Sequence, residues 1–175
     1  VSGRYSPLRP LLDNFGEWGA KTVEQELFHG IAAGQSPAQA MRNVRRALGY
    51  APTRAATMLR TEMFRAYREG NRALYQANSH LVKSWIWHSA TDSRTCSACW
   101  GMHGTEHPLT EPMGTHPNCR CAMIPKTKDW GEIDPRLKGI PDTSPVIEPG
   151  YKAFDRLTER QQRMILGPSK LAAYK

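Results

Sequence analysis

All four cysteines of this 175-residue chain fall within one short stretch. They form two pairs, Cys96-x2-Cys99 and Cys119-x-Cys121, and His116 precedes the second pair. Two short ligand pairs separated by roughly 15–20 residues are typical of zinc sites. A C-x2-C turn places two thiolates on one side of a tight loop, about 2.3 Å from a shared Zn²⁺, and a second pair completes the tetrahedron. The spacing therefore predicts a structural Zn²⁺.

The chain between the two pairs, residues 100–118, is rich in Gly, Pro, His and Thr and has few aliphatic side chains to bury. A metal would hold such a loop together. Five candidate ligands compete for four positions: the first pair and Cys119 are the safest, while His116 and Cys121 compete for the last one. Disulfides that bridge the two pairs, or four reduced thiols, are the alternatives.

Two charged residues flank the cysteines. Asp92 opens a turn in which its side chain can accept backbone N–H groups and position the first pair. Arg120 lies between the cysteines of the second pair. It can donate to the thiolates or pair with Asp92, which would orient the metal ligands, or it can face the solvent.

Hydrophobic residues at steps of three and four predict three helices before the cysteines, over residues 7–31, 36–49 and 52–78. Ser36 followed by Pro37 predicts a capped start for the second helix, and Gly49 predicts its end.

The pattern then changes to that of strands. Residues 81–88 alternate and include Trp85 and Trp87 on one face, which favours a core position over a stacking platform for single-stranded nucleic acid. A short strand over 120–124 is expected to pair with 85–88 and form an antiparallel sheet.

Five prolines predict an extended connector between residues 125 and 150. Apolar periodicity then returns, and Thr158-x-x-Gln161 is a capping box that predicts a helix ending at Gly167-Pro168. We expect this tail to dock its apolar side on the core.

The predicted fold class is α+β: N-terminal helices packed on a small antiparallel sheet with a zinc-stapled loop, then an extended connector and short C-terminal helices. The predicted segments are an N-terminal helical segment (1–50), a core with the long helix, strand and Cys/His loop (51–125), and a connector with C-terminal docking helices (126–175).

The chain carries a net charge of +8 and has a pI near 9.6, which favours polyanionic partners. The candidate nucleic-acid contacts are arginines on the second and third predicted helices: Arg42, Arg45, Arg46, Arg68 and Arg72. A solvated helix face is the alternative reading of these arginines.

No segment approaches the roughly 20 apolar residues that cross a bilayer, so no membrane partner is expected. The chain begins at Val1 with neither an initiator methionine nor the apolar run of a signal peptide, which indicates a fragment or a processed product. We expect it to be made in a reducing cytoplasm, where clustered thiols favour metal over disulfides.

The cysteine stretch resembles the phage Mu F-like minor head proteins, the phage head morphogenesis family. The resemblance covers about residues 55–175. The motifs that carry it are Trp85-Ile-Trp, Asp92-Ser-Arg94-Thr-Cys96-Ser-Ala-Cys99, a Gly-containing loop, His116-Pro-Asn-Cys119-Arg120-Cys121 and Pro125, together with Arg60-Thr61-Glu62 and Gln162-Arg-Met-Ile-Leu-Gly167. Around the family's central glycine the chain departs from the usual leucine and phenylalanine, with Met102, His103 and Glu106.

This resemblance implies a non-enzymatic virion component that acts in capsid assembly, in the head interior or near the portal, after synthesis in the host cytoplasm. It implies the portal protein, the scaffold or the major capsid protein as partners, and it allows contact with double-stranded DNA.

The alternative is a zinc-stabilised nuclease or toxin-type enzyme domain, in which His103, His107 or His116 works with Asp92 to activate water. A closed tetrahedral zinc site leaves no position for a catalytic water, which disfavours this alternative. Nearby glycines and Pro108 disfavour a helix over 103–107, so we expect His103 and His107 in a surface loop. No catalytic residue is predicted.

Overall fold

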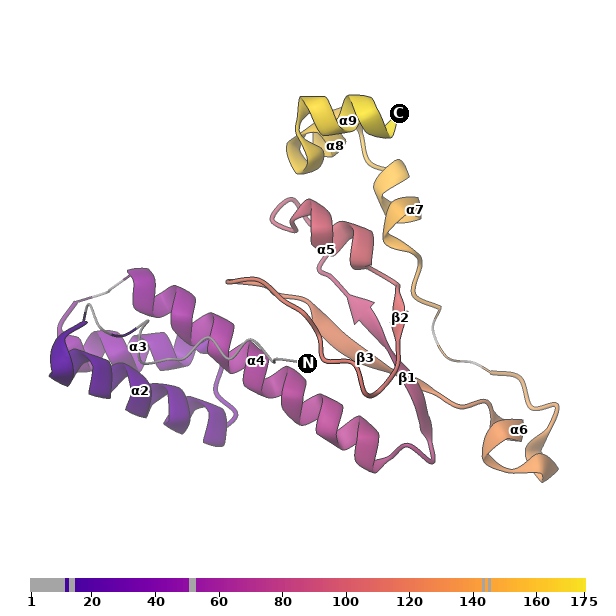
Figure 1. The fold of residues 1–175 in the computed structure, drawn as a ribbon, viewed down its shortest axis with the longest axis horizontal. Coiled ribbons are helices and arrows are strands. Elements are labelled where there is room, and N and C mark those ends of the chain that lie inside the picture. Colours follow the sequence, from indigo (N-terminus) through magenta and orange to yellow (C-terminus); the bar gives the residue numbers. More distant parts are fainter. Residues whose placement is uncertain (1–11, 13–14, 51–52, 143, 145) are drawn as a thin grey trace. The chain divides into compact units, whose positions relative to one another are not determined.

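The structure is a computed structural model that describes residues 12, 15–50, 53–142, 144 and 146–175 (Figure 1). It divides into two compact units. The first joins Val1–Tyr67 to Thr115–Cys119, and the second joins Arg68–Gly114 to Arg120–Lys175. Helices together with a small antiparallel sheet confirm the predicted α+β class. The predicted segments 1–50, 51–125 and 126–175 stay a prediction.

The first unit holds α2 (Gly16–Ala32), α3 (Pro37–Leu48) and the beginning of α4 (Thr53–Ala77). The predicted start of the first helix, near residue 7, lies outside the described residues. The helix α3 forms as predicted: the Ser36 hydroxyl accepts the Gln39 N–H at 3.3 Å, and Gly49 ends the helix with a φ of 73°.

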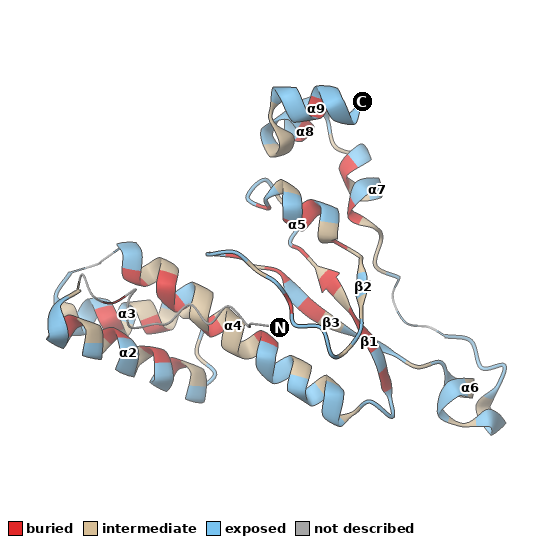
Figure 2. Cartoon of the chain, viewed as in Figure 1, coloured by how far each residue is buried: buried red, intermediate tan, exposed pale blue. Residues whose placement is uncertain are grey.

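The periodic apolar positions of these helices form one core (Figure 2). Val23, Val44 and Met63 are each 0% exposed, and burying a side chain of this kind stabilises a fold by about 1.5–3 kcal/mol. The Tyr67 hydroxyl donates to the Gln35 carbonyl at 2.6 Å. The buried members of this core are Leu12, Val23, Leu27, Ala40, Val44, Ala55, Met58, Leu59 and Met63.

The second unit holds a three-stranded antiparallel sheet in the order β2-β1-β3 (Figure 1). The central strand β1 (Val82–His88) pairs with β3 (Ala122–Thr127), which confirms the predicted pairing. Trp85 and Trp87 are buried, at 0% and 5% exposed, and this confirms their core role. The edge strand β2 (Glu106–His107) was not predicted, because two residues are too few to show an alternating pattern.

The connector after β3 differs from the extended chain that its prolines predict. It contains α6 (Trp130–Ile133) and the 3₁₀ turn η2 (Pro135–Leu137). The Asp129 and Glu132 side chains form a reciprocal capping box, which nucleates a turn that is too short to show helical periodicity.

The tail folds into α7 (Gly150–Asp155), α8 (Glu159–Leu166) and α9 (Pro168–Tyr174). The capping box of Thr158 and Gln161 forms as predicted. Gly167-Pro168 ends α8, which confirms the predicted end of this helix, and Pro168 also begins α9, which was not predicted. Proline fits the first helical position because its missing N–H has no helical acceptor there.

The tail packs against α5 (Ser97–Met102), the short helix that contains Cys99 and is capped by Cys96. Trp100, Phe154 and Leu171 form an apolar cluster, which confirms that the tail docks its apolar side. The Gly150 N–H donates to the His103 carbonyl at 2.8 Å. A Cβ atom at Gly150 would lie 2.0 Å from the Trp100 carbonyl oxygen, so only glycine fits this approach.

None of the helices among the described residues combines the length and the apolar composition needed to cross a bilayer.

Candidate metal centre

The first cysteine pair is set by the start of α5. Cys96 occupies the cap position, and its sulfur accepts the Cys99 N–H at 3.4 Å. This bond turns the Cys96 side chain back toward the helix, as a serine cap would. Cys99 is 4% exposed, whereas Cys96 is exposed. The sequence did not predict α5 because a helix of six residues is too short to show periodicity.

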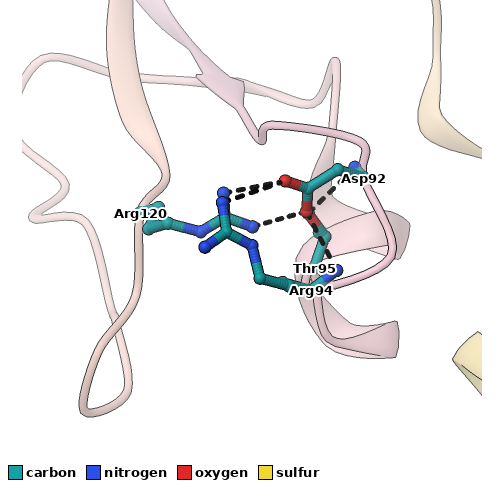
Figure 3. A network of polar contacts seen from close by, with 4 residues as sticks. All are labelled: Asp92, Arg94, Thr95 and Arg120. Atoms are coloured by element: carbon teal, nitrogen blue, oxygen red, sulfur yellow. Dashed lines mark hydrogen bonds and ion pairs between the residues drawn. The ribbon is translucent and has the colours of Figure 1, made fainter.

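Asp92 holds the turn before α5 (Figure 3). Its Oδ1 accepts the Arg94 N–H and the Thr95 hydroxyl, each at 3.0 Å. Arg120 donates from Nη1 to Oδ2 at 2.8 Å and from Nη2 to Oδ1 at 2.5 Å, a bidentate pair. The pairing of Arg120 with Asp92, one of the arrangements that the sequence allowed, forms in the structure.

This pairing also fixes the charge of Asp92. The hydrogen bonds from Arg120, followed by those from Thr95 and the Arg94 N–H, hold the pKa of Asp92 well below its usual range. The carboxylate is therefore ionised at any pH at which thiolates bind metal. Arg120 directly precedes Cys121, so its ion pair with Asp92 connects the backbone at Cys121 to the turn that leads to Cys96 and Cys99.

The turn before Cys119 depends on α4. Asn118 has a φ of 60°, a left-handed conformation that asparagine tolerates. Its N–H donates to the Thr61 hydroxyl at 3.0 Å, and its side-chain amide donates to the Thr57 hydroxyl at 3.3 Å. The Cys119 N–H donates to the His116 carbonyl at 3.1 Å, which closes the turn.

The motif Arg60-Thr61-Glu62 is part of the family resemblance, but the role of Thr61 in this turn was not predicted. The relevant signal is the pair Thr57 and Thr61, one helical turn apart, which presents two hydroxyls on one face of α4.

The backbone after Cys119 is also anchored. The Arg68 Nε–H donates to the Cys121 carbonyl at 2.9 Å, and the Tyr75 hydroxyl donates to the Met123 carbonyl at 3.1 Å. Arg68 was a candidate nucleic-acid contact, but its side chain is 6% exposed. The structure therefore places Arg68 among the supports of the second cysteine pair and not on the surface.

The five predicted ligands fall into two overlapping groups. The ligand atoms of Cys96, Cys99 and His116 all lie within 4.8 Å of one another, and so do those of Cys99, Cys119 and Cys121. Neighbouring sulfurs around a tetrahedral Zn²⁺ lie about 3.8 Å apart, given a Zn–S distance of about 2.3 Å. No disulfide joins any two of the four cysteines, all of which are described residues. The donor set therefore fits a soft divalent metal.

Three of the five donors are buried: Cys99, Cys119 and Cys121. His116 is exposed, and its Nδ1 lies 2.8 Å from the Pro117 carbonyl. With a proton on Nδ1, the lone pair of the ring lies on Nε2, the arrangement seen in many metal-binding histidines.

The other two histidines of this stretch are bound to the fold. His103 is 8% exposed and its Nδ1 accepts the Ser89 N–H at 3.0 Å, so its expected position in a surface loop is wrong. Burial, followed by the charge of His88, lowers the pKa of His103. His107 lies in β2, stacks on Trp85 with ring centroids 4.3 Å apart, and contacts the Thr105 hydroxyl at 2.8 Å. Both rings therefore have structural contacts.

The remaining candidate nucleic-acid contacts lie on two helices. Arg42, Arg45 and Arg46 are exposed on α3. Arg72, on α4, forms an ion pair with Glu69 at 2.8 Å. The basic character of α3 is therefore less compensated than that of α4.

Together these features define a small α+β protein in which a Cys/His cluster able to hold a metal ion is fixed by charged and hydroxyl side chains. A family model described as phage Mu protein F like protein matches residues 21–124. The match spans more than half of the chain, and the chain belongs to this family, the phage head morphogenesis family. No curated protein and no solved structure matches the chain significantly.

Proposed function

We propose that the chain is a non-enzymatic component of the phage head that acts in capsid assembly near the portal and contacts the packaged DNA. Its membership in the phage Mu protein F like family carries this proposal. Its partners are then the portal protein, the scaffold or the major capsid protein, and its place is the head interior or the vicinity of the portal, reached from the host cytoplasm during assembly.

Purified phage heads test the location. Mass spectrometry of purified heads, combined with cross-linking, is expected to detect this chain and to join it to peptides of the portal, scaffold or major capsid protein. Its absence from heads, with presence only in the host cytoplasm, would contradict the proposal.

The proposal includes a structural Zn²⁺ held by Cys96, Cys99, Cys119 and Cys121. Three of these thiols are the buried donors of the cluster, and the fourth caps the helix that carries Cys99. Four thiolates fill a tetrahedral site, so the metal would cross-link the two cysteine pairs and leave no position for substrate. Asp92 and Arg120 would orient the backbone on both sides of the ion. His116 is the exposed neighbour of this set.

Elemental analysis of protein purified under reducing conditions without chelator tests the metal, with about one zinc per chain expected. The variant Cys119→Ser should lose the metal and much of its thermal stability. His116→Asn is the matched control and should retain one zinc, with the same thiolate charge-transfer absorption after cobalt substitution. If His116→Asn loses the metal, the ligand set contains His116 in place of one of the four thiolates.

A plasmid assay tests the absence of enzymatic activity. His103 and His107 have structural contacts and Asp92 is paired with Arg120, and these contacts support a structural reading. Supercoiled plasmid incubated with the protein and Mg²⁺ or Mn²⁺ should stay intact. Nicking that disappears in His107→Ala or Asp92→Ala would establish the nuclease alternative instead.

A further inference from the structure

A hollow of about 240 Å³ lies on the surface of the helical unit, between α3 and α4. Several water molecules fit in such a volume, since each occupies roughly 30 Å³ in the liquid. The lining residues come from one face of each helix: Pro37, Ala38, Met41, Arg42 and Arg45 of α3, and Ala56 and Arg60 of α4. The lining thus combines three guanidinium groups with small apolar side chains and contains no acidic residue.

The guanidinium groups at this hollow differ from those further along α4. Arg65 is paired with Glu62 and Arg72 with Glu69, each at 2.8 Å. Within the part of the chain that the structure describes, Arg45 and Arg60 have no hydrogen bond or ion pair, and Arg42 bonds only to the neutral Gln39 side chain.

The sequence of α3 explains this difference. The helix contains three arginines and no aspartate or glutamate, so it offers no intrahelical partner for Arg42 or Arg45. Its first turn, which carries Pro37 and Ala38, adds the positive end of a helix dipole to the same hollow. A concentration of positive charge with no internal partner favours an anion.

We infer that this hollow binds one phosphate of a double-stranded DNA backbone through Arg42, Arg45 and Arg60. The inference rests on the proposed contact with packaged DNA, and it names the site of that contact. Guanidinium groups bind phosphate oxygens through paired N–H donors, which suits arginine better than lysine for this task. Arg60 was not among the sequence-based candidates for nucleic-acid binding.

The composition of the lining indicates binding without sequence preference. Direct readout of bases requires side chains that match their edges in a groove, and binding of single strands commonly uses aromatic stacking. The lining offers guanidinium groups and small apolar side chains, with no aromatic ring. Contacts of this kind position a duplex by its backbone and carry no sequence information.

Fluorescence anisotropy over a series of salt concentrations tests the site with the full chain and short mixed-sequence DNA duplexes. Each neutralised phosphate contributes about 0.9 to the slope of log affinity against log salt. The variants Arg45→Gln and Arg60→Gln should each reduce the slope, by at most about that amount, because the site neutralises one phosphate. Between 50 and 200 mM salt, wild type should then lose up to about 3.5-fold more affinity than either variant.

The double variant Arg45→Gln, Arg60→Gln should reduce the slope by no more than about 0.9, because both side chains contact the same phosphate. Arg46→Gln is the matched control: Arg46 is exposed on the same helix, outside the hollow, and carries the same charge. Its slope should stay at the wild-type value. Thermal melting checks that each variant folds.

Equal changes in the slope for Arg45→Gln and Arg46→Gln would show that the hollow is not the phosphate site. The protein would then contact DNA through its overall positive charge. A wild-type protein that binds no duplex even at low salt would overturn the proposed DNA contact itself, and the site with it.

Discussion

The helical core of the first unit and the cysteine-bearing turns hold their backbones by different means. The core buries Val23, Val44 and Met63 completely. The turns depend on directed contacts: Asp92 accepts hydrogen bonds from three residues, and Asn118 donates to two threonines. Apolar burial is non-directional and tolerates a change of partner, whereas a turn held by a few polar contacts fails when one of them is lost.

Removal of metal should separate the two regions most strongly. Structural Zn²⁺ contributes an apparent free energy of roughly 10–16 kcal/mol in small zinc domains. Addition of a chelator should therefore expose the backbone amides of residues 89–121 to hydrogen exchange, while the amides of α2 and α3 stay protected. Hydrogen exchange with mass spectrometry measures both in one sample. Equal loss of protection in both regions would show that the helical core also depends on the metal.

Truncation in the helical core should have the converse effect. Leu27→Ala removes a side chain that is 4% exposed and should lower the free energy of unfolding by about 2–5 kcal/mol. The zinc content should not change. Urea unfolding and elemental analysis measure the two quantities. Leu74→Ala is the control, because Leu74 is 57% exposed on α4 and its truncation should change stability by less than about 0.5 kcal/mol.

A methyl group at Gly150 should detach the tail from α5. The new Cβ would overlap the Trp100 carbonyl oxygen, and forced overpacking costs about 1–3 kcal/mol. Limited proteolysis of Gly150→Ala should release the segment after residue 150 faster than in wild type. Gly101→Ala, within α5, meets no atom within 4 Å and should instead gain roughly 0.5–1 kcal/mol. An intact tail in Gly150→Ala would disprove this close approach.

Loss of the bidentate pair between Asp92 and Arg120 should affect metal binding and leave the helical core unchanged. Residues that orient metal ligands typically contribute 10–100-fold to metal affinity, so Asp92→Asn should weaken zinc binding by about tenfold or more. Competition with a chromophoric chelator measures the zinc affinity of wild type and variant. Arg94→Gln is the control, since Arg94 is exposed and its guanidinium lies 3.7 Å from the Asp92 carboxylate. An unchanged zinc affinity in Asp92→Asn would show that the ion pair of Asp92 and Arg120 does not support metal binding.

The ratio of the zinc affinity of wild type to that of Asp92→Asn should depend on pH as the lowered pKa of Asp92 dictates. A carboxylate with a lowered pKa contributes its stabilisation above its unfolded pKa of about 3.9, and loses it as the pH falls from there toward the folded value. The ratio of wild-type to variant affinity should therefore stay constant between about pH 6 and 8. A ratio that falls as the pH is lowered from about 8 to 6 would mean that Asp92 becomes protonated near neutral pH.

The sequence predicts the parts of this fold that repeat a pattern or begin with a recognisable cap. Ser36 and Thr158 mark helix starts, the alternation around Trp85 marks β1, and the cysteine spacing marks the candidate ligands. Elements of two to six residues, such as β2 and α5, contain fewer than two full repeats of the strand or helix period. Their positions follow from tertiary contacts that a single sequence does not display.

The supporting residues of the candidate site were harder to predict than its ligands. Arg68 was assigned to a basic surface because its helix carries charge on several faces, yet its Nε–H donates to the Cys121 carbonyl. Thr57 and Thr61 are ordinary helix residues until the Asn118 turn is placed beside them. Chemical identity marks a ligand in the sequence, whereas a support is defined by the backbone group that it contacts.

The close approach at Gly150 also constrains evolution. A single added methyl group would overlap the Trp100 carbonyl. A homologue that keeps this tail arrangement must therefore keep glycine at position 150. A related chain that aligns through the cysteines but carries a larger residue there must attach its tail in another way. A larger residue at that one position therefore identifies a homologue in which the tail no longer docks in this way.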